Sequence, residues 1–185
     1  SLASACYSAL ESEDVTLIRT PISWRSEDWV FNEPLDHLGF DGGGGIGSGV
    51  GMAVGGALAL KHSDRLPVAV LGDGDYLMGV SGLWTAVHHG IPLLIIVANN
   101  RSFFNDELHQ ERVAIARDRD VNNKGVGIRL DQPDVDLVGM ASAQGCVGFG
   151  PIHTSDDLRH ELVLAVEQLK AGKVVVIDAR VSRSY

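Results

Sequence analysis

Cysteine is scarce in this chain of 185 residues, which has only Cys6 and Cys146. Their separation is not that of metal-ligating cysteines, so we expect both to fill core positions in a reducing compartment, which favours a cytoplasmic protein. No stretch reaches the roughly 18 consecutive apolar residues that a membrane-spanning helix needs. No secretory signal is visible, but the chain opens on Ser1 rather than Met, as an excised domain would, so targeting stays open.

Positive charge is also in short supply. The 15 Lys and Arg residues are outnumbered by 24 Asp and Glu residues, which gives a formal net charge of −9. This balance argues against a nucleic-acid-binding surface, which needs clustered Lys and Arg to neutralise phosphates. It does not exclude a small phosphorylated ligand that is held by backbone amides or by a metal ion.

Short apolar runs alternate with helical patterns along the chain, and this alternation predicts βαβ units. The runs at 66–72 and 92–99 are almost continuously apolar, as expected of strands covered on both faces of a parallel sheet. We therefore predict one α/β domain over residues 1–185, a three-layer sandwich in which helices flank a mainly parallel sheet. The predicted strands are 15–20, 66–72, 92–99, 146–150 and 173–180, and the predicted helices are 49–62, 80–89, 134–144 and 155–172.

The pattern marks some segments more clearly than others. The last predicted helix has clear ends, since Ser155 can cap it and Gly172 can end it. Residues 103–133 are polar, charged and without an apolar period, and the stretch 111–120 within them indicates a solvated face. We expect a functional or mobile loop there, because long irregular segments in compact domains are usually of that kind.

Two polar motifs follow neighbouring predicted strands. Gly72-Asp73-Gly74 stands at the end of one strand, and Asn99-Asn100 stands at the end of the next. Each could be an ordinary turn. In a parallel sheet, however, ligands bind at the carboxyl ends of the strands, so both motifs are expected at one rim. Their side-chain oxygens are hard ligands of the kind that Mg²⁺ prefers.

A glycine-rich tract, FDGGGGIGSGVGMAVGG at 40–56, is the third motif. Gly42, Gly44 and Gly47 fit the G-x-G-x-x-G dinucleotide fingerprint, and Asp64 stands where a ribose-binding acid would be. The residues before the tract do not form a convincing buried strand, which the fingerprint requires, so a nicotinamide or flavin site is the weaker alternative. Four successive glycines suit a place where backbone approaches a ligand closely.

Together these motifs resemble the signature of thiamine-diphosphate enzymes, in which Gly-Asp-Gly is followed by Asn-Asn. Here Asn100 stands 27 residues after Asp73. GGIGSGVGMAVGGALA resembles the glycine-rich block of the family, and SGLWTAVHHGIP is similar to the corresponding helix of benzoylformate decarboxylase. The resemblance covers nearly the whole chain. It points to the C-terminal, diphosphate-binding domain of the superfamily of acetolactate synthase, benzoylformate decarboxylase and pyruvate decarboxylase.

The resemblance implies thiamine diphosphate and Mg²⁺ as cofactors. It implies that the side chains of Asp73 and Asn100 and the main-chain carbonyl of Ser102 hold the metal. Family members usually have a small hydroxyl where Asp75 stands, so a carboxylate here has to point away from the diphosphate. The further positions carried over as cofactor contacts are Gly44, whose carbonyl would meet the 4′-amino group, Ile46, which would prop the bent cofactor, and Gly45, Gly74, Asp75, Thr20 and Ser23.

The activity that the resemblance implies is decarboxylation of a 2-keto acid, with or without addition of the product to a second carbonyl. Asp106 is the candidate active-site acid. The glutamate that protonates the aminopyrimidine comes, in this family, from a pyrimidine-binding domain, and no position here matches its motif. The chain alone is therefore expected to be inactive and to work within a homodimer or homotetramer. Alternatives are a natural small subunit of a two-chain sulfopyruvate or phosphonopyruvate decarboxylase, and a non-catalytic cofactor-binding domain.

Overall fold

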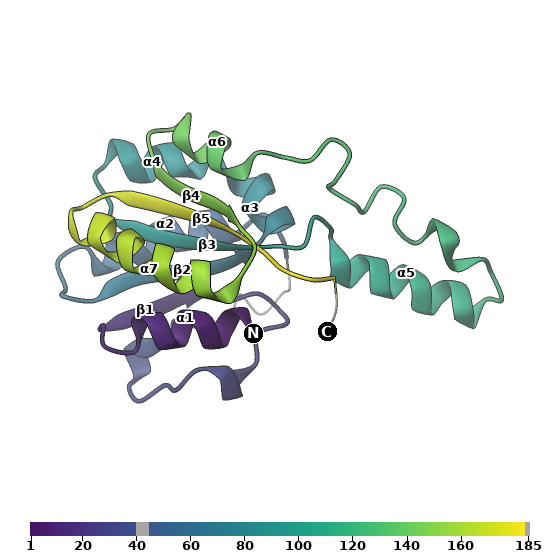
Figure 1. Ribbon diagram of the computed structural model, residues 1–185, viewed down its shortest axis with the longest axis horizontal. Coiled ribbons are helices and arrows are strands. Elements are labelled where there is room, and N and C mark those ends of the chain that lie inside the picture. The colour runs from purple at the N-terminus through teal and green to yellow at the C-terminus, as the bar shows by residue number, and fades with distance from the viewer. Residues whose placement is uncertain (40–44, 184–185) are drawn as a thin grey trace.

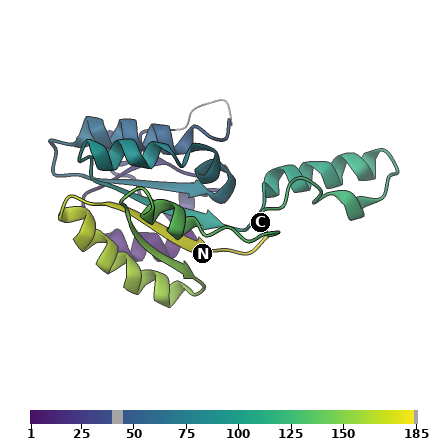
Figure 2. The same cartoon turned by 90° about the horizontal axis from the view of Figure 1, so that it is seen from above.

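A five-stranded, fully parallel sheet forms the centre of the molecule. The computed structural model describes residues 1–39 and 45–183. The strand order is β1-β2-β3-β5-β4, and helices lie on both faces, so the chain has three layers (Figure 2). This confirms the predicted fold class. The strands are β1 (Val15–Arg19), β2 (Leu66–Gly72), β3 (Leu93–Asn99), β4 (Val147–Ile152) and β5 (Val174–Arg180).

Alternate residues of each strand pack into two separate cores, because successive side chains point to opposite faces of a sheet. Val68 and Val70 of β2 belong to the core beneath α1 (Leu2–Leu10) and α7 (Ser155–Lys170). Ala69 and Leu71 belong to the core on the other face. The helices that cover this second face are α2 (Gly49–Leu60), α3 (Asp73–Gly79), α4 (Gly82–His88) and α6 (Leu137–Ser142).

The central strands β2 and β3 are shielded from solvent over almost their whole length. Residues 93–97 of β3 are all fully buried, as are residues 68–71 of β2. Burying a large aliphatic side chain contributes about 1.5–3 kcal/mol, so these two strands are held firmly within the sheet. Their carboxyl ends therefore form a rigid base for the residues that follow them.

One helix projects from the body of the molecule. This helix, α5 (Phe104–Ala116), extends away from the sheet together with the segment that returns after it (Figure 1). The prediction of an irregular segment over 103–133 is therefore wrong at this helix. The helix lacks an apolar period because it does not pack on the sheet. Its far half is solvated as predicted, with Ile115 65 % exposed.

Several element boundaries differ from the sequence-based expectations. The cap of α7 is Thr154, whose hydroxyl accepts from the Asp157 N–H, and not Ser155. Gly172 follows the end of that helix with φ +82°, as expected of a terminating glycine. α1 was not expected, and the helix α3 begins directly at Asp73. None of the described helices is long and apolar enough to cross a membrane.

Candidate functional site

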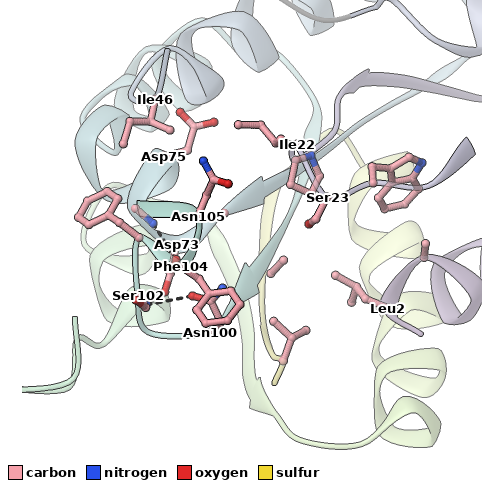
Figure 3. A pocket seen from close by; sticks show the side chains of 18 of the residues that line it. Leu2, Ile22, Ser23, Ile46, Asp73, Asp75, Asn100, Ser102, Phe104 and Asn105 are labelled. Carbon is pink, nitrogen blue, oxygen red and sulfur yellow. Dashed lines mark hydrogen bonds between the residues drawn. The ribbon is translucent and has the colours of Figure 1, made fainter. Parts of the chain in front are cut away.

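The two polar motifs lie at one rim of the sheet, as the sequence predicts. β2 ends at Gly72 and β3 at Asn99, and Gly72 pairs in register with Ala98. A cavity of about 870 Å³ opens over this rim, between the ends of the two strands and the loop that follows β1 (Figure 3). Both motifs contribute side chains to its wall.

Asp73, Asn100 and Ser102 converge in the wall of the cavity. The Ser102 N–H donates both to Oδ2 of Asp73, at 3.1 Å, and to Oδ1 of Asn100, at 3.0 Å. The Gly74 N–H donates to the other oxygen, Oδ1 of Asp73, at 2.9 Å. Asp73 and Ser102 are each only 3 % exposed. The side-chain oxygens of two predicted metal ligands, Asp73 and Asn100, are thus brought together at the amide of the third, Ser102.

The first asparagine of the Asn-Asn pair has a structural task. Asn99 donates through Nδ2 to Oδ1 of Asp178 on β5, at 2.9 Å. Its Oδ1 accepts from the N–H of Arg101, a residue that has the left-handed conformation with φ +58°. Asn99 therefore fixes the sharp change of chain direction that turns Asn100 and Ser102 toward the cavity.

This arrangement fits a hard divalent cation. Burial raises the pKa of the Asp73 carboxyl to about 6, and the hydrogen bonds that oppose the rise come from backbone amides. A cation would stabilise the charged carboxylate. The described residues contain no group of three or more His, Cys, Asp or Glu that could hold a metal. The candidate ligands are instead one carboxylate, one amide oxygen and one main-chain carbonyl, a set that suits Mg²⁺ completed by ligand oxygens and water.

The carboxylate of Asp75 is engaged with the glycine-rich loop. Its Oδ1 accepts from the N–H groups of Gly47, at 2.6 Å, and Gly49, at 3.0 Å. Its Oδ2 pairs with Nη2 of Arg19 at 3.3 Å. A Cβ on Gly49 would lie 2.3 Å from Oδ2 of Asp75, so the close approach requires glycine. The unexpected acid is therefore neutralised and hydrogen-bonded within the protein.

The loop after Asn100 is held from two sides. Glu107 of α5, 3 % exposed, accepts from the Ser102 hydroxyl at 3.1 Å and from Arg129 at 2.9 Å. The Arg129 bond lowers the pKa of Glu107 most, and the Ser102 bond lowers it further. Arg183 donates to the carbonyl of Asn100 at 2.9 Å. The projecting segment and the C-terminal segment thus fix the main chain around the candidate metal ligands.

Only some of the remaining predicted site residues line the cavity. Ser23, Ile46 and Asp106 line the cavity, with Ile46 42 % exposed. Thr20 is buried and is not among the lining residues. Gly45 directs its carbonyl toward Arg19 at 3.4 Å. Gly44 lies outside the described residues, so its predicted role stays a prediction.

Sequence reasoning missed Arg19 and Glu107. Arg19 ends β1 and lines the cavity, although it is only 4 % exposed. A signal existed, because a lone cation at the end of an apolar strand faces the same rim as the two polar motifs. Glu107 gave no signal, since its burial depends on Arg129, 22 residues away in the chain.

A parallel α/β domain with a cavity at the carboxyl ends of its central strands, lined by apolar side chains and a few convergent polar groups, is typical of cofactor-binding domains. Residues 23–179 match the sequence model of the family described as thiamine pyrophosphate enzyme, C-terminal TPP binding domain. The chain belongs to this family. The resemblance drawn from the motifs is thereby confirmed.

Individual relatives agree with this assignment. The chain is similar to the acetolactate synthase large subunit of Haemophilus influenzae, with 30 % identity over 156 residues, which cover 84 % of this chain and 25 % of the relative. It is also similar to benzoylformate decarboxylase of Pseudomonas aeruginosa, with 29 % identity over 98 residues, 51 % of this chain and 18 % of the relative. The chain thus spans about a quarter of the length of the acetolactate synthases it matches.

The fold also matches that of solved structures. The structure of benzoylformate decarboxylase from Polynucleobacter necessarius superposes with a TM-score of 0.76 at 22 % identity. The match covers 99 % of this chain and 33 % of that one. At this identity the likeness confirms the fold, and the sequence match carries the family.

Proposed function

We propose that this chain is the diphosphate-binding half of a thiamine-diphosphate-dependent enzyme that decarboxylates 2-keto acids, joins the resulting carbanion to a second carbonyl, or does both. The convergence of the Asp73 and Asn100 side-chain oxygens on the amide of Ser102 is the observation that carries this proposal. The names of the relatives, acetolactate synthase and benzoylformate decarboxylase, support the reaction class. Bound thiamine diphosphate supplies the electron sink for this chemistry.

The residues of this chain bind and orient the cofactor. The Asp73 carboxylate, the Asn100 side-chain oxygen and the Ser102 carbonyl would hold Mg²⁺, whose charge would offset that of the diphosphate. Gly74 and Ile46 line the cavity, so Gly74 would bring the main chain close to the phosphates and Ile46 would present an apolar side chain to the cofactor. Asp106, exposed in the cavity wall, is the candidate acid for proton transfer to or from the substrate.

A second domain completes the site. Ile22 and Ile46 are 57 % and 42 % exposed at the cavity, and apolar side chains exposed in this way support the docking of a partner. We assign this place to a pyrimidine-binding domain, which supplies the glutamate that the chain lacks, in a homodimer or homotetramer. Mass measurement by light scattering of the complete protein tests the assembly. The 185 residues alone are expected to show no turnover, and decarboxylation of pyruvate by them at an ordinary enzymatic rate would contradict this.

Calorimetric titration with thiamine diphosphate tests the metal site most directly. The wild type and Asp73→Asn are titrated with and without Mg²⁺, in the complete protein or complex that contains this chain. Asp36→Asn is the matched control. Asp36 also accepts two backbone N–H groups, at 2.7 and 2.9 Å, but it pairs with Arg65, which precedes β2 at the opposite end of the strand from the site.

We expect tight binding by the wild type only with Mg²⁺. In Asp73→Asn binding should weaken by about a hundredfold, because an amide does not offer the cation the negative charge of the carboxylate. The control should bind like the wild type. Tight binding that needs no Mg²⁺ and survives Asp73→Asn would overturn the metal assignment. Binding of NAD without metal would favour the dinucleotide alternative instead.

A further inference from the structure

The glycine-rich loop from residue 45 to residue 49 is tied to the body of the protein at three points by one ion pair. Arg19 donates through Nη2 to the Gly45 carbonyl at 3.4 Å and to Oδ2 of Asp75 at 3.3 Å. Oδ1 of Asp75 accepts from the N–H groups of Gly47 and Gly49. Arg19 comes from the end of β1, whereas Asp75 comes from the first turn of α3. The pair therefore links two rigid elements to both ends of the loop.

Ile46 lies between the first two tied positions, Gly45 and Gly47. It lines the cavity from the side of Asp75, as Figure 3 shows, and its own side chain is 42 % exposed. Hydrogen bonds of the main chain on both sides of Ile46 thus fix the direction in which its side chain projects. Gly47 has φ +94°, a conformation that a side chain would strain, so the loop adopts this path only with glycine there.

We propose that Arg19 and Asp75 are positioning residues, a clamp that holds Ile46 in the cavity in the orientation that binds the cofactor. The proposal rests on the proposed function for the identity of that cofactor. Both partners are nearly buried, with side chains 4 % and 7 % exposed, so the pair is shielded from competing water. The guanidinium reaches a carbonyl and a carboxylate at once, which a lysine ammonium at the same distance does less well.

A purely electrostatic role of Asp75 predicts the opposite change in cofactor affinity for the variant Asp75→Asn. If Asp75 only added negative charge beside the diphosphate, removing its charge would strengthen binding of the cofactor. If Asp75 positions the loop, removing its charge or its oxygens weakens binding, because Gly47 and Gly49 lose their acceptor and Ile46 is no longer fixed. Asp75→Asn has nearly the shape of the native side chain and separates these two cases.

The test measures two quantities on the complete protein or complex that contains this chain. The first is affinity for thiamine diphosphate at saturating Mg²⁺, followed by quenching of tryptophan fluorescence. The second is hydrogen exchange of the peptides that span residues 45–52, measured without cofactor. The variants are Asp75→Asn, Asp75→Ala and Arg19→Lys. Asp36→Asn serves again as the control, because it alters a carboxylate with two amide donors and an arginine partner away from the site.

We expect Asp75→Asn and Asp75→Ala to weaken cofactor binding by about tenfold or more, which corresponds to the loss of one charge-assisted hydrogen bond. Exchange of residues 45–52 should rise in both. Arg19→Lys should shift both measurements in the same direction by a smaller factor, and it decides the question if Asp75→Ala does not fold. The control should leave both measurements unchanged.

Unchanged or stronger binding in Asp75→Asn would overturn the clamp, as would unchanged exchange of residues 45–52 in every variant. Failure of the wild type to bind thiamine diphosphate would overturn the proposed function instead. The exchange measurement contains no cofactor, so it would still decide whether the pair holds the loop.

Discussion

Replacing Gly74 with alanine probes how closely the loop after β3 packs against α3. A Cβ on Gly74 would lie 2.2 Å from Cε1 and 2.5 Å from Cδ1 of Phe103, well inside van der Waals contact. The ring must move, and it is attached to the residue that follows Ser102 in the candidate metal site. Overpacking of this kind costs about 1–3 kcal/mol of the free energy of unfolding.

Helix propensity acts in the opposite direction. Gly74 lies in the first turn of α3, where alanine would stabilise the helix by up to about 1 kcal/mol. The steric cost is larger, so we expect Gly74→Ala to lower the free energy of unfolding by about 1–2 kcal/mol. The melting temperature of a chain of this size should then fall by about 2–8 °C.

Gly55→Ala is the matched control. Gly55 lies in the interior of α2, and a Cβ there would meet no atom within 4 Å. We expect this variant to gain about 0.5–1 kcal/mol, since only the helix-propensity term applies. Thermal and urea unfolding, followed by circular dichroism, compares both variants with the wild type. The reasoning is refuted if Gly74→Ala stabilises the chain as Gly55→Ala does, because Phe103 would then not be packed against α3.

Two further predictions concern regions away from the cavity. Thr154→Ala should lower the free energy of unfolding by about 1 kcal/mol because it removes the cap of α7, whereas Ser155→Ala should be nearly neutral. The reverse order of the two variants in urea unfolding would show that Ser155 is the cap. The backbone N–H groups of Glu33 and Asn32 hold the pKa of the Asp36 carboxyl below its usual range. The stabilising contribution of this carboxylate is therefore present above the ordinary aspartate pKa and is lost as pH falls through the folded-state pKa. Stability measured against pH should therefore fall less steeply in acid for Asp36→Asn than for the wild type, and parallel profiles would contradict this.

The strands and the rim were accessible from the sequence because burial leaves a pattern in it. A short continuous apolar run such as 66–72, bounded by turn residues, indicates a strand covered on both faces, and the residue that follows such a strand lies at the carboxyl edge of the sheet. Asp73 and Asn100 could be placed together by this reasoning alone. The spacing between them added the family, which the comparison with known proteins confirms.

Features that no buried apolar pattern marks left little trace in the sequence. The helix α5 has no apolar face to mark it, because it projects from the body rather than packing on the sheet (Figure 1). Thr154 and Ser155 are both able to cap a helix, and only the local backbone conformation selects the first. In the sequence Glu107 looks like an ordinary exposed acid, and only the structure shows that it is buried and bonded to Arg129 and Ser102.

The sequence by itself determined the fold class, the rim and the residue types of the candidate metal site, since these follow from local periodicity and from the order of motifs along the chain. Only the tertiary structure decided what Asp75 does. Its carboxylate accepts hydrogen bonds from the amides of Gly47 and Gly49 and from the guanidinium of Arg19, 56 residues away in the chain. Such a contact is a property of three-dimensional packing, because no local pattern specifies which distant donors a buried charge will find.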